Sequence, residues 1–380
     1  MDLIQANKIL QAEHGVVADY ADEFFGYFGW PTVARMDDGT LIASSSGLRN
    51  YHVCPFGRTV ICTSTDDGRT WTSPRVINDT PLDDRDSGII SLGGRRLLLT
   101  WFSVDARGAK PSEYELGLSP QEALWWRQGM GNMSDDATER YGGSWVRTSD
   151  DGGLTWDDPV RVPVSSPHGP NRLANGDLVY LGKTVAPNEI GQVMNTGSIG
   201  LIRSSDDGRI WTAQGSVSLP KGLDMECFHE PHVVELGDGR LLGLVRYDPN
   251  HHDYGNRQPG QTDFQMCQSI SCDGGKTWST AEILEFHGSP PHLLRHSSGV
   301  LVTTYGYREK PYGVRAMLSH DDGETWRYDY ILRDDGPHPD LGYPSSVELG
   351  DGSILTVYYQ QPRSVDDKCA LLSSRWRLPV

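Results

Sequence analysis

Five copies of one eight-residue pattern constrain the fold of this chain more than any other feature. The pattern is Ser-x-Asp-x-Gly-x-Thr-Trp, and in the third copy isoleucine replaces the threonine. The copies occupy Ser64–Trp71, Ser149–Trp156, Ser204–Trp211, Ser271–Trp278 and Ser319–Trp326. In such an octet the Asp side chain can accept backbone N–H groups, the Gly can adopt positive φ and the Trp can pack between neighbouring sheets. The recurrence indicates a series of similar structural units.

A second repeat consists of short apolar runs on either side of a tight Gly-containing turn, which is typical of β-hairpins. Its copies run from Trp30 to Leu41, Ser87 to Leu97, Pro170 to Leu178, Pro231 to Leu241, Pro291 to Leu301 and Pro344 to Ile354. A hairpin returns the chain to its starting edge. We therefore expect Glu230, before the first strand of one copy, and Arg246, at the end of its second strand, to lie together at a rim.

Composition excludes several classes of partner. The 380 residues carry a net charge of −17, which argues against nucleic acid and anionic membranes as partners. No apolar run reaches the length of a membrane span. The six cysteines show no metal-ligand spacing and are expected to be reduced, buried thiols. The first residues lack the features of a signal peptide, so a cytoplasmic protein is expected.

The octets are similar to Asp boxes, and the whole chain resembles the sialidase superfamily of six-bladed β-propellers. The resemblance implies an all-β fold in a single domain over residues 1–380, with six four-stranded antiparallel blades. Each hairpin would form the two inner strands of a blade, and each Asp box would join the two outer strands. The sixth unit lacks an Asp box. An N-terminal strand near Lys8–Gln11 would pair with Cys369–Ser373 and close the ring.

An insertion of about residues 105–143 follows the second strand of blade two. Ser119-Pro120-Gln121-Glu122 predicts a capping box that opens a short helix. At this position the insertion would overhang the site face, either as a lid or as a contact between the subunits of a homo-oligomer.

The resemblance also implies a set of catalytic groups. Sialidase-type enzymes bind a substrate carboxylate with three arginines and use a Tyr nucleophile paired with a Glu, together with an Asp acid/base. Tyr343 resembles the nucleophile, Glu230 its partner, and Arg246 and Arg308 two of the arginines, with Arg315 as a rival to Arg308. A Glu230–Arg246 ion pair that only braces the ring is the structural alternative.

Two positions depart from the family pattern. Trp30 stands where the first arginine is expected, so the site could hold a carboxylate with two arginines and an indole, or it could hold a neutral sugar stacked on Trp30. Residues 47–57, where the acid/base Asp is expected, contain no carboxylate and offer only Arg49, which is a candidate for binding substrate, and His52. Sialic acid specificity is therefore an open question at this stage.

Asp84 and Asp86 are further candidates for the acid/base, because crowded carboxylates raise at least one pKa. Arg85 could instead neutralise them in a solvated loop, and His52 remains the other candidate. Histidines at positions expected to face the site, such as His168 and His292, would donate hydrogen bonds to a sugar. No histidine spacing supports a metal site, and no cofactor is expected.

The sequence thus predicts a retaining exo-glycosidase of the sialidase type that acts on a terminal acidic or hydroxyl-rich sugar. The alternatives are another propeller enzyme (an arabinan exo-hydrolase, an inverting glycosidase or a uronate lyase) and a non-catalytic carbohydrate-binding propeller. The catalytic hypothesis requires the Tyr343 hydroxyl to lie within hydrogen-bond distance of Glu230.

Overall fold

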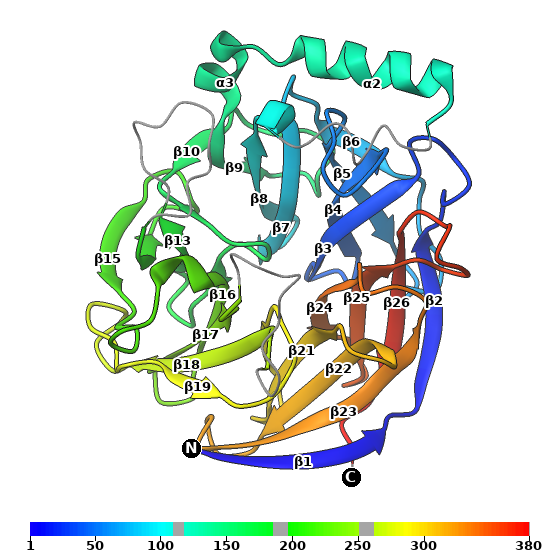
Figure 1. Ribbon diagram of the computed structural model, residues 1–380. Coiled ribbons are helices and arrows are strands. Elements are labelled where there is room, and N and C mark those ends of the chain that lie inside the picture. The colour runs from blue at the N-terminus through cyan, green and yellow to red at the C-terminus, as the bar shows by residue number, and fades with distance from the viewer. Residues whose placement is uncertain (109–117, 185–196, 251–261, 380) are drawn as a thin grey trace.

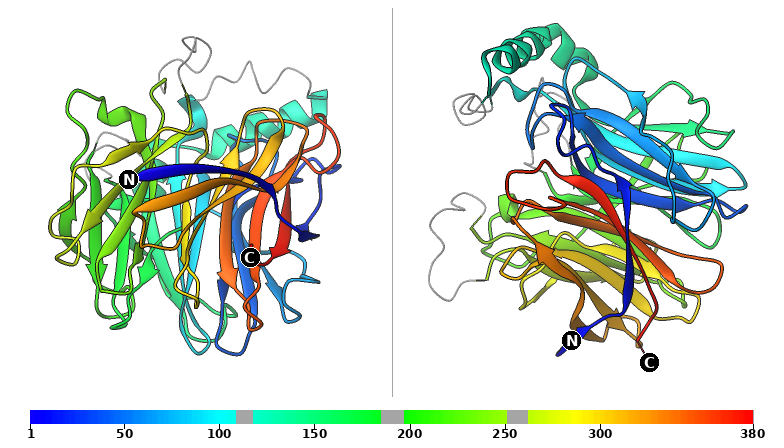
Figure 2. Two further views of the ribbon diagram at one scale, coloured as in Figure 1. Left: turned by 90° about the horizontal axis from the view of Figure 1, so that it is seen from below. Right: turned by 90° about the vertical axis from the view of Figure 1, so that its right-hand side faces the viewer.

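Six β-sheets surround a central axis in the computed structural model of the chain, which describes residues 1–108, 118–184, 197–250 and 262–379 (Figure 1). The predicted six-bladed propeller is confirmed. In side view the strands run along the axis, and the helices of the insertion lie towards one end of it (Figure 2).

The first three blades follow one another along the chain. Blade one contains β3 (Tyr27–Arg35), β4 (Leu41–Arg49), β5 (Arg58–Ser64) and β6 (Arg75–Asn78). Blade two contains β7 (Asp83–Gly93), β8 (Arg96–Val104), β9 (Gly143–Ser149) and β10 (Val160–Val162). Blade three contains β11 (Val164–Ser165), β12 (Asn171–Arg172), β13 (Leu178–Thr184), β14 (Ile199–Ser204) and β15 (Thr212–Ser216). Its innermost strand is divided, since β11 and β12 both pair with β13.

The last three blades include both ends of the chain. Blade four contains β16 (Phe228–Glu235), β17 (Leu241–Tyr247), β18 (Gln265–Ser271) and β19 (Glu282–Leu284). Blade five contains β20 (His292–Arg295), β21 (Leu301–Tyr307), β22 (Tyr312–Ser319), β23 (Thr325–Gly336) and β1 (Asp2–Ile9). Blade six contains β24 (Gly342–Glu348), β25 (Ile354–Gln360), β26 (Ala370–Trp376) and β2 (Ala12–Ala18). Short 3₁₀ turns occur at η1 (Ala106–Gly108) and η2 (Met225–Cys227).

Ring closure differs from the prediction in position. The strand that pairs with β26 is β2, which begins at Ala12, and not a strand at Lys8–Gln11. Lys8 and Ile9 belong instead to β1, which adds a fifth, parallel strand to blade five through β23. The N-terminal segment therefore covers the outer edges of two adjacent blades, which removes two exposed sheet edges.

The Asp boxes have the hydrogen bonds that the octet predicts. In blade one, Asp66 Oδ1 accepts the backbone N–H of Thr70 (2.9 Å), Ser64 Oγ accepts that of Gly68 (3.0 Å), and Trp71 Nε1 donates to the Gly68 carbonyl (3.1 Å). Gly68 has a φ of +81°, and a Cβ there would lie 2.8 Å from Leu355 of blade six. The turn therefore closes on itself and also packs against the preceding blade.

The insertion forms α2 (Pro120–Asn132) and α3 (Asp135–Tyr141), with residues 109–117 outside the described part. The predicted capping box is present, since Ser119 Oγ accepts the Glu122 N–H (3.3 Å) and Glu122 Oε2 accepts the Ser119 N–H (2.8 Å). Trp126 packs edge-on against Phe56 of the blade-one loop at a centroid distance of 6.3 Å. The insertion is therefore anchored on the rim of blades one and two.

All six cysteines are free thiols; five are buried, whereas Cys272, in the fourth Asp box, is exposed. Within the described residues, no helix combines the length and the apolar character that crossing a bilayer requires.

Candidate active site

Four blades share an unusual backbone feature in their innermost strand. Trp30, Asp86, Glu230 and Tyr343 have φ values of +52°, +46°, +47° and +48°, and the strand register shifts at each of them. Left-handed backbone costs about 1–2 kcal/mol for a residue other than glycine. Strain of this kind concentrates at functional sites, and a bulge re-aims a side chain. Glu230 and Tyr343 thus lie at bulges inside strands β16 and β24, and not before the first strands as predicted.

Tyr343 and Glu230 meet although 113 residues separate them in sequence. The Tyr343 hydroxyl donates a hydrogen bond of 2.5 Å to Glu230 Oε1. Arg246 Nη1 donates to Glu230 Oε2 (2.6 Å) and to the Tyr343 oxygen (3.2 Å). The contact that the catalytic hypothesis requires is therefore present.

Burial determines the protonation state of this phenol. Tyr343 is only 5% exposed, and burial, together with the neighbouring Glu230 carboxylate, raises its pKa well above the usual value. Arg246 acts in the opposite direction. The phenol is therefore protonated at neutral pH, and its proton already points at Glu230, the group that would accept it.

Arg246 is held by two carboxylates. Besides Glu230, Asp248 accepts hydrogen bonds from its Nε (2.8 Å) and Nη2 (2.6 Å). The ion pair that we considered as the structural alternative is thus real, and it orients the same guanidinium that contacts Tyr343. Bracing and orienting the site are compatible roles for this residue.

Arg308 lies at the site, and its rival does not. The Arg308 guanidinium is 5.5 Å from the centre of the Tyr343 ring and donates to the Leu341 carbonyl (3.0 Å). Arg315 is buried in the outer part of blade five, where it pairs with Asp329 (3.3 Å) and stacks on Tyr307.

The two candidate aspartates have different environments. Asp84 accepts hydrogen bonds from the Thr80 N–H (2.9 Å), the Thr80 hydroxyl (2.7 Å) and the Ser103 hydroxyl (2.5 Å), so its carboxylate is saturated by neighbours. Asp86 Oδ1 is buried, and no described residue donates to it. Burial raises the pKa of both to about 7. Only Asp86 combines this pKa with an unsatisfied oxygen beside the site.

A cavity of about 160 Å³ lies beside the Tyr343–Glu230 pair and is lined by Asp86, Glu230, His229 and Lys183, among others. Lys183 was missed by the sequence reasoning. Its Nζ lies 3.4 Å from His229 Nδ1, and burial lowers its pKa to about 8. Lys183 comes near the end of the apolar run of β13, much as Arg246 comes near the end of β17, and that recurrence could have revealed it.

Trp30 occupies the position of the absent arginine but is almost inaccessible. The indole is 1% exposed, and the guanidinium groups of Arg85 and Arg49 lie 4.2 and 4.9 Å from its centre. A sugar therefore has little indole surface on which to stack, contrary to the expectation. Arg85, which the sequence reasoning treated only as a neutralising charge, brings a guanidinium close to this position.

His52 lies against the Trp30 indole and is partly exposed. Its Nδ1 contacts Asp340 Oδ1 (3.0 Å), and the hydroxyl groups of Tyr27 (2.9 Å) and Tyr359 (3.0 Å) also donate to Asp340. Asp340 was missed as well, although it lies just before the Leu341-Gly342-Tyr343 segment. This carboxylate fixes the His52 ring at the edge of the site.

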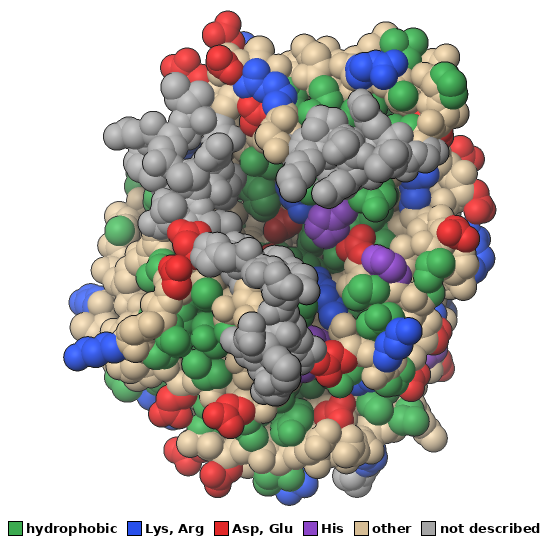
Figure 3. Space-filling view, in the orientation of Figure 1, with side chains coloured by type: hydrophobic (Ala, Val, Ile, Leu, Met, Phe, Trp, Pro, Cys, Tyr) green, Lys and Arg blue, Asp and Glu red, His purple; other side chains and the backbone are tan. Residues whose placement is uncertain are grey.

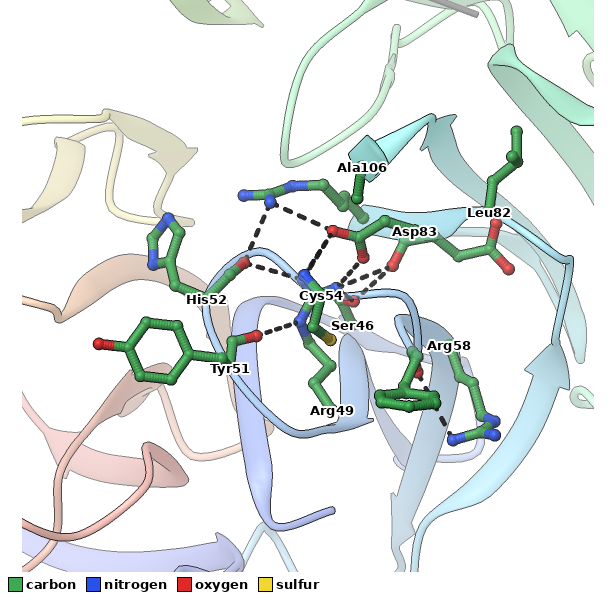
Figure 4. Close-up of polar contacts among 12 residues, drawn as sticks. Ser46, Arg49, Tyr51, His52, Cys54, Arg58, Leu82, Asp83 and Ala106 are labelled. Atoms are coloured by element: carbon green, nitrogen blue, oxygen red, sulfur yellow. Dashed lines mark hydrogen bonds and ion pairs between the residues drawn. The ribbon is translucent and has the colours of Figure 1, made fainter. Parts of the chain in front are cut away.

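Arg49 has a structural role. It forms a buried two-point ion pair with Asp83 (2.6 and 2.9 Å) and donates to the carbonyls of Tyr51 (3.2 Å) and His52 (2.8 Å) (Figure 4). Because Arg49 is fully buried (0% exposed), this geometry does not support the expected role in binding substrate. Arg49 instead ties the blade-one loop to blade two.

His168 and His292 are not at the bulges that carry Trp30, Asp86, Glu230 and Tyr343. They line the central cavity together with Arg35 and Arg295, which lie near the hairpin turns at the opposite end of the channel. His232 lines the same cavity and follows Glu230 by two residues along β16. The histidines therefore lie in a layer two residues further along β16 than the Glu230 bulge. Across the described ranges, no group of three or more His, Cys, Asp or Glu side chains could hold a metal ion.

The face that bears the insertion is hollowed at its centre, and acidic, basic and histidine side chains surround the hollow (Figure 3). A propeller with Asp boxes and a buried Tyr–Glu–Arg cluster at the axis defines the class of this protein. The model of the BNR repeat-like domain matches residues 116–356, which is more than half of the chain. The chain belongs to the BNR repeat-like family and is a divergent member of the sialidase superfamily.

Individual relatives are distant. The chain is 22% identical over 364 residues to a sialidase of Micromonospora viridifaciens; the match covers 88% of this chain, which spans only about half (50%) of that relative's length. A solved protein of unknown function from Dyadobacter fermentans superposes with a TM-score of 0.72 at 22% identity, covering 97% of this chain and 98% of that one. The Hadza microbial sialidase superposes with a TM-score of 0.64 at 16% identity, covering 96% and 68%. At these identities the structural likeness describes the fold alone.

Proposed function

We propose that the protein is a sialidase-like exo-glycoside hydrolase that retains the anomeric configuration of a terminal acidic or hydroxyl-rich sugar. The hydrogen bond between the Tyr343 hydroxyl and Glu230 supports this proposal more than any other observation. A phenol with a raised pKa is a poor nucleophile by itself, and an adjacent carboxylate that accepts its proton makes it a competent one.

The proposed reaction has two steps. In the first, Tyr343 Oη attacks the anomeric carbon while Glu230 takes the phenol proton and the bond to the leaving oxygen breaks. Asp86 gives its proton to that oxygen. In the second step the Asp86 carboxylate removes a proton from water, water attacks the anomeric carbon, and the Tyr343–sugar bond breaks with the phenol proton returning from Glu230. Two inversions give net retention.

Asp86 is preferred over His52 as the acid because of its environment. Its pKa of about 7 leaves it partly protonated at neutral pH, and it lines the same cavity as Glu230. The close Glu230 charge helps to keep the proton on Asp86 until a leaving group is present.

Substrate would be held by Arg246 and Arg308, which approach Tyr343 from blades four and five. Both charges act locally within a chain of net charge −17, so they can hold an anionic sugar despite the overall field. Trp30 replaces the third arginine, and a sugar whose carboxylate is absent or replaced by hydroxyl groups therefore remains within the proposal.

The test is a panel of sialosides, uronides and arabinosides incubated with the full chain, with the released sugar identified and its first-formed anomer followed by NMR. Hydrolysis with retention is the expected result. An unsaturated product that absorbs in the ultraviolet would identify a lyase, and inversion would remove Tyr343 as nucleophile. Binding of a sugar without turnover would identify a carbohydrate-binding propeller.

A further inference from the structure

Three histidines lie together on the axis, away from the catalytic bulges. His168, His232 and His292 come from the inner edges of blades three, four and five, and their ring centres lie 4.7 to 5.8 Å apart. All three line a central cavity of about 350 Å³. The proposed reaction uses none of them.

The hydrogen bonds of two of these rings fix their tautomer. His232 Nδ1 accepts the backbone N–H of Leu293 (2.9 Å), and His292 Nδ1 accepts that of Ser346 (3.3 Å). A backbone amide can only donate, so each Nδ1 is unprotonated and each neutral ring carries its hydrogen on Nε2. These contacts also join blade four to blade five and blade five to blade six.

His168 completes the set. Its Nδ1 lies 3.1 Å from the Thr32 hydroxyl, whereas that hydroxyl is 3.5 Å from the Pro167 carbonyl, which is too long for a good O–H···O bond. The hydroxyl therefore donates to Nδ1 and leaves the hydrogen on Nε2. His168 is 3% exposed, and its Nε2 has no hydrogen-bond partner among the described residues. A buried, unpaired N–H donor is destabilising because it has lost its hydrogen bonds to water, so a bound acceptor would stabilise it.

The positive charge at the open end of the cavity also favours a bound anion. Arg35, Arg172 and Arg295 line it from blades one, three and five, and in the described part of the chain none of their guanidinium groups forms a hydrogen bond or an ion pair. The Nε of Arg35 is buried without a partner. The carboxylate in this lining, Glu235, already accepts the Ala174 N–H (2.5 Å). Three uncompensated cations at one mouth are notable in a chain of net charge −17.

A metal ion is the obvious rival, and the tautomers argue against it. A metal needs a ring nitrogen without a hydrogen, and the backbone bonds of His232 and His292 put the hydrogen on the nitrogen left over. Burial also keeps these rings neutral, since it lowers the pKa of His232 to about 3 and those of His168 and His292 well below the usual value. The rings therefore present neutral N–H donors.

We propose that this end of the central channel binds a polyvalent oxyanion of the sulfate or phosphate class, which enters past the three arginines and accepts hydrogen bonds from the imidazole Nε2–H groups. The anion would bridge blades that no covalent bond holds together at the axis, and it would lie at the opposite end of the channel from the catalytic bulges. The site does not depend on the proposed glycosidase activity.

The test is isothermal titration of the full chain with sodium sulfate and with inorganic phosphate at constant ionic strength, accompanied by melting curves. One anion per chain should bind with a dissociation constant in the millimolar range or tighter, which is about −4 kcal/mol or better, and should raise Tm. Crystals soaked in selenate should show one anomalous peak among the three imidazoles.

Two variants locate the site. The double variant Arg172→Leu/Arg295→Leu changes exposed side chains and should weaken anion binding about tenfold or more. His168→Phe keeps a ring of similar size, removes the unpaired donor and should weaken binding as well. The matched control is Arg209→Leu/Arg327→Leu, which removes the same two charges from exposed positions, one inside the third Asp box and one directly after the fifth, and should bind the anion like the original chain.

Three results would overturn the proposal. One is the absence of any saturable binding of sulfate or phosphate at about 10 mM, since a built site should be largely filled there. Another is an equal loss of binding in the control, which would reduce the effect to general charge. The third is one-to-one binding of Zn²⁺ that His168→Phe abolishes, which would show that the rings act as metal ligands.

Discussion

The Asp boxes and the bulges at Trp30, Asp86, Glu230 and Tyr343 both use left-handed backbone, but they stabilise it in different ways. In the Asp boxes the residues with positive φ include Asp67, Asp207 and Asp322, each followed by a glycine of positive φ. Aspartate tolerates this region, and the turn is closed within eight residues by its own Ser and Asp side chains, and by Thr in the boxes that contain one. The left-handed backbone of each box is thus stabilised by contacts within the box.

The bulges put a tryptophan, a glutamate and a tyrosine into the same backbone region, where bulky residues are true outliers. No local turn satisfies them. Their side chains are satisfied across blades, as when Tyr343 of blade six donates to Glu230 of blade four. Local strain at the boxes therefore serves stability, whereas strain at the bulges is maintained by tertiary contacts and aims side chains at the axis.

The largest expected effect comes from removing one oxygen at the bulges. Tyr343→Phe should reduce kcat/KM on the order of 10⁴-fold or more, because among the described residues no other hydroxyl is paired with Glu230, while the Tm changes by a few degrees at most. The control is Tyr305→Phe, which removes a buried hydroxyl that accepts the Asp329 N–H in blade five. That variant should lose stability and keep its activity. Retained turnover in Tyr343→Phe would eliminate the proposed nucleophile.

The next effect should fall on stability alone. Trp278→Ala empties a buried position in the fourth Asp box and should lower the free energy of unfolding by about 3–5 kcal/mol. Because the box lies at the other end of the blade from the bulges, kcat/KM measured well below Tm should be unchanged. A parallel loss of activity would show that the boxes and the bulges are coupled, and would contradict separate roles for them in stability and activity.

Asp86→Asn should lower kcat/KM and, at high pH, raise stability. We expect kcat/KM to fall by about 10²–10⁴-fold with a poor leaving group and much less with an aryl leaving group that needs no proton. In the original chain activity should decline as the pH rises through about 7, since the acid must be protonated. If His52 were the acid, His52→Gln and not Asp86→Asn would show this dependence on the leaving group.

The same substitution gives a stability prediction with a definite sign. The pKa of Asp86 is raised from 3.8 in the unfolded chain to about 7 in the folded one, so the folded state binds more protons between these values. Stability therefore decreases as the pH rises through that window, and Asp86→Asn should be more stable than the original chain above pH 7, by roughly 1–3 kcal/mol. Unfolding by denaturant at two pH values measures the difference. A less stable variant at high pH would contradict the assigned environment.

The smallest expected effect is on KM, and it should distinguish Arg308 from Arg315, both of blade five. Arg308→Met should raise KM about 10–100-fold for an acidic sugar, because a charged hydrogen bond is worth about 1.5–3 kcal/mol. Its effect on a neutral substrate should be smaller. Arg315→Met removes the same charge from a buried ion pair with Asp329 and should lower Tm without changing KM. Equal changes of KM in both variants would contradict this assignment.

Much of the fold could be predicted from the sequence because its information is local. Each Asp box is encoded within eight residues, and so is the capping box at Ser119, so both could be identified without long-range contacts. Ring closure was predicted correctly in kind and wrongly in position. Pairing with β26 requires a particular register, and the alternation of the N-terminal segment does not distinguish Lys8–Gln11 from Ala12–Ala18.

The candidate site was predictable only in part. Tyr343 and Glu230 could be named because their segments resemble those of the sialidase nucleophile and its partner at equivalent places in two blades, but Asp84 and Asp86 are indistinguishable in the sequence. Only the bulge separates them, since it puts Asp84 among hydrogen-bond donors and Asp86 beside the cavity. Lys183 and Asp340 were missed because their partners come from other segments of the chain.

By itself, the sequence determined the repeat, the number of blades and the residues able to do the chemistry, because turns and hairpins are set by neighbours in the chain. Tertiary structure alone decided which of those residues meet, that Trp30 is covered by two guanidinium groups, and that three imidazoles share the axis with their hydrogens on Nε2. The reason is physical: protonation and accessibility depend on groups that other blades bring within a few ångströms, and distance along the chain carries no record of that approach.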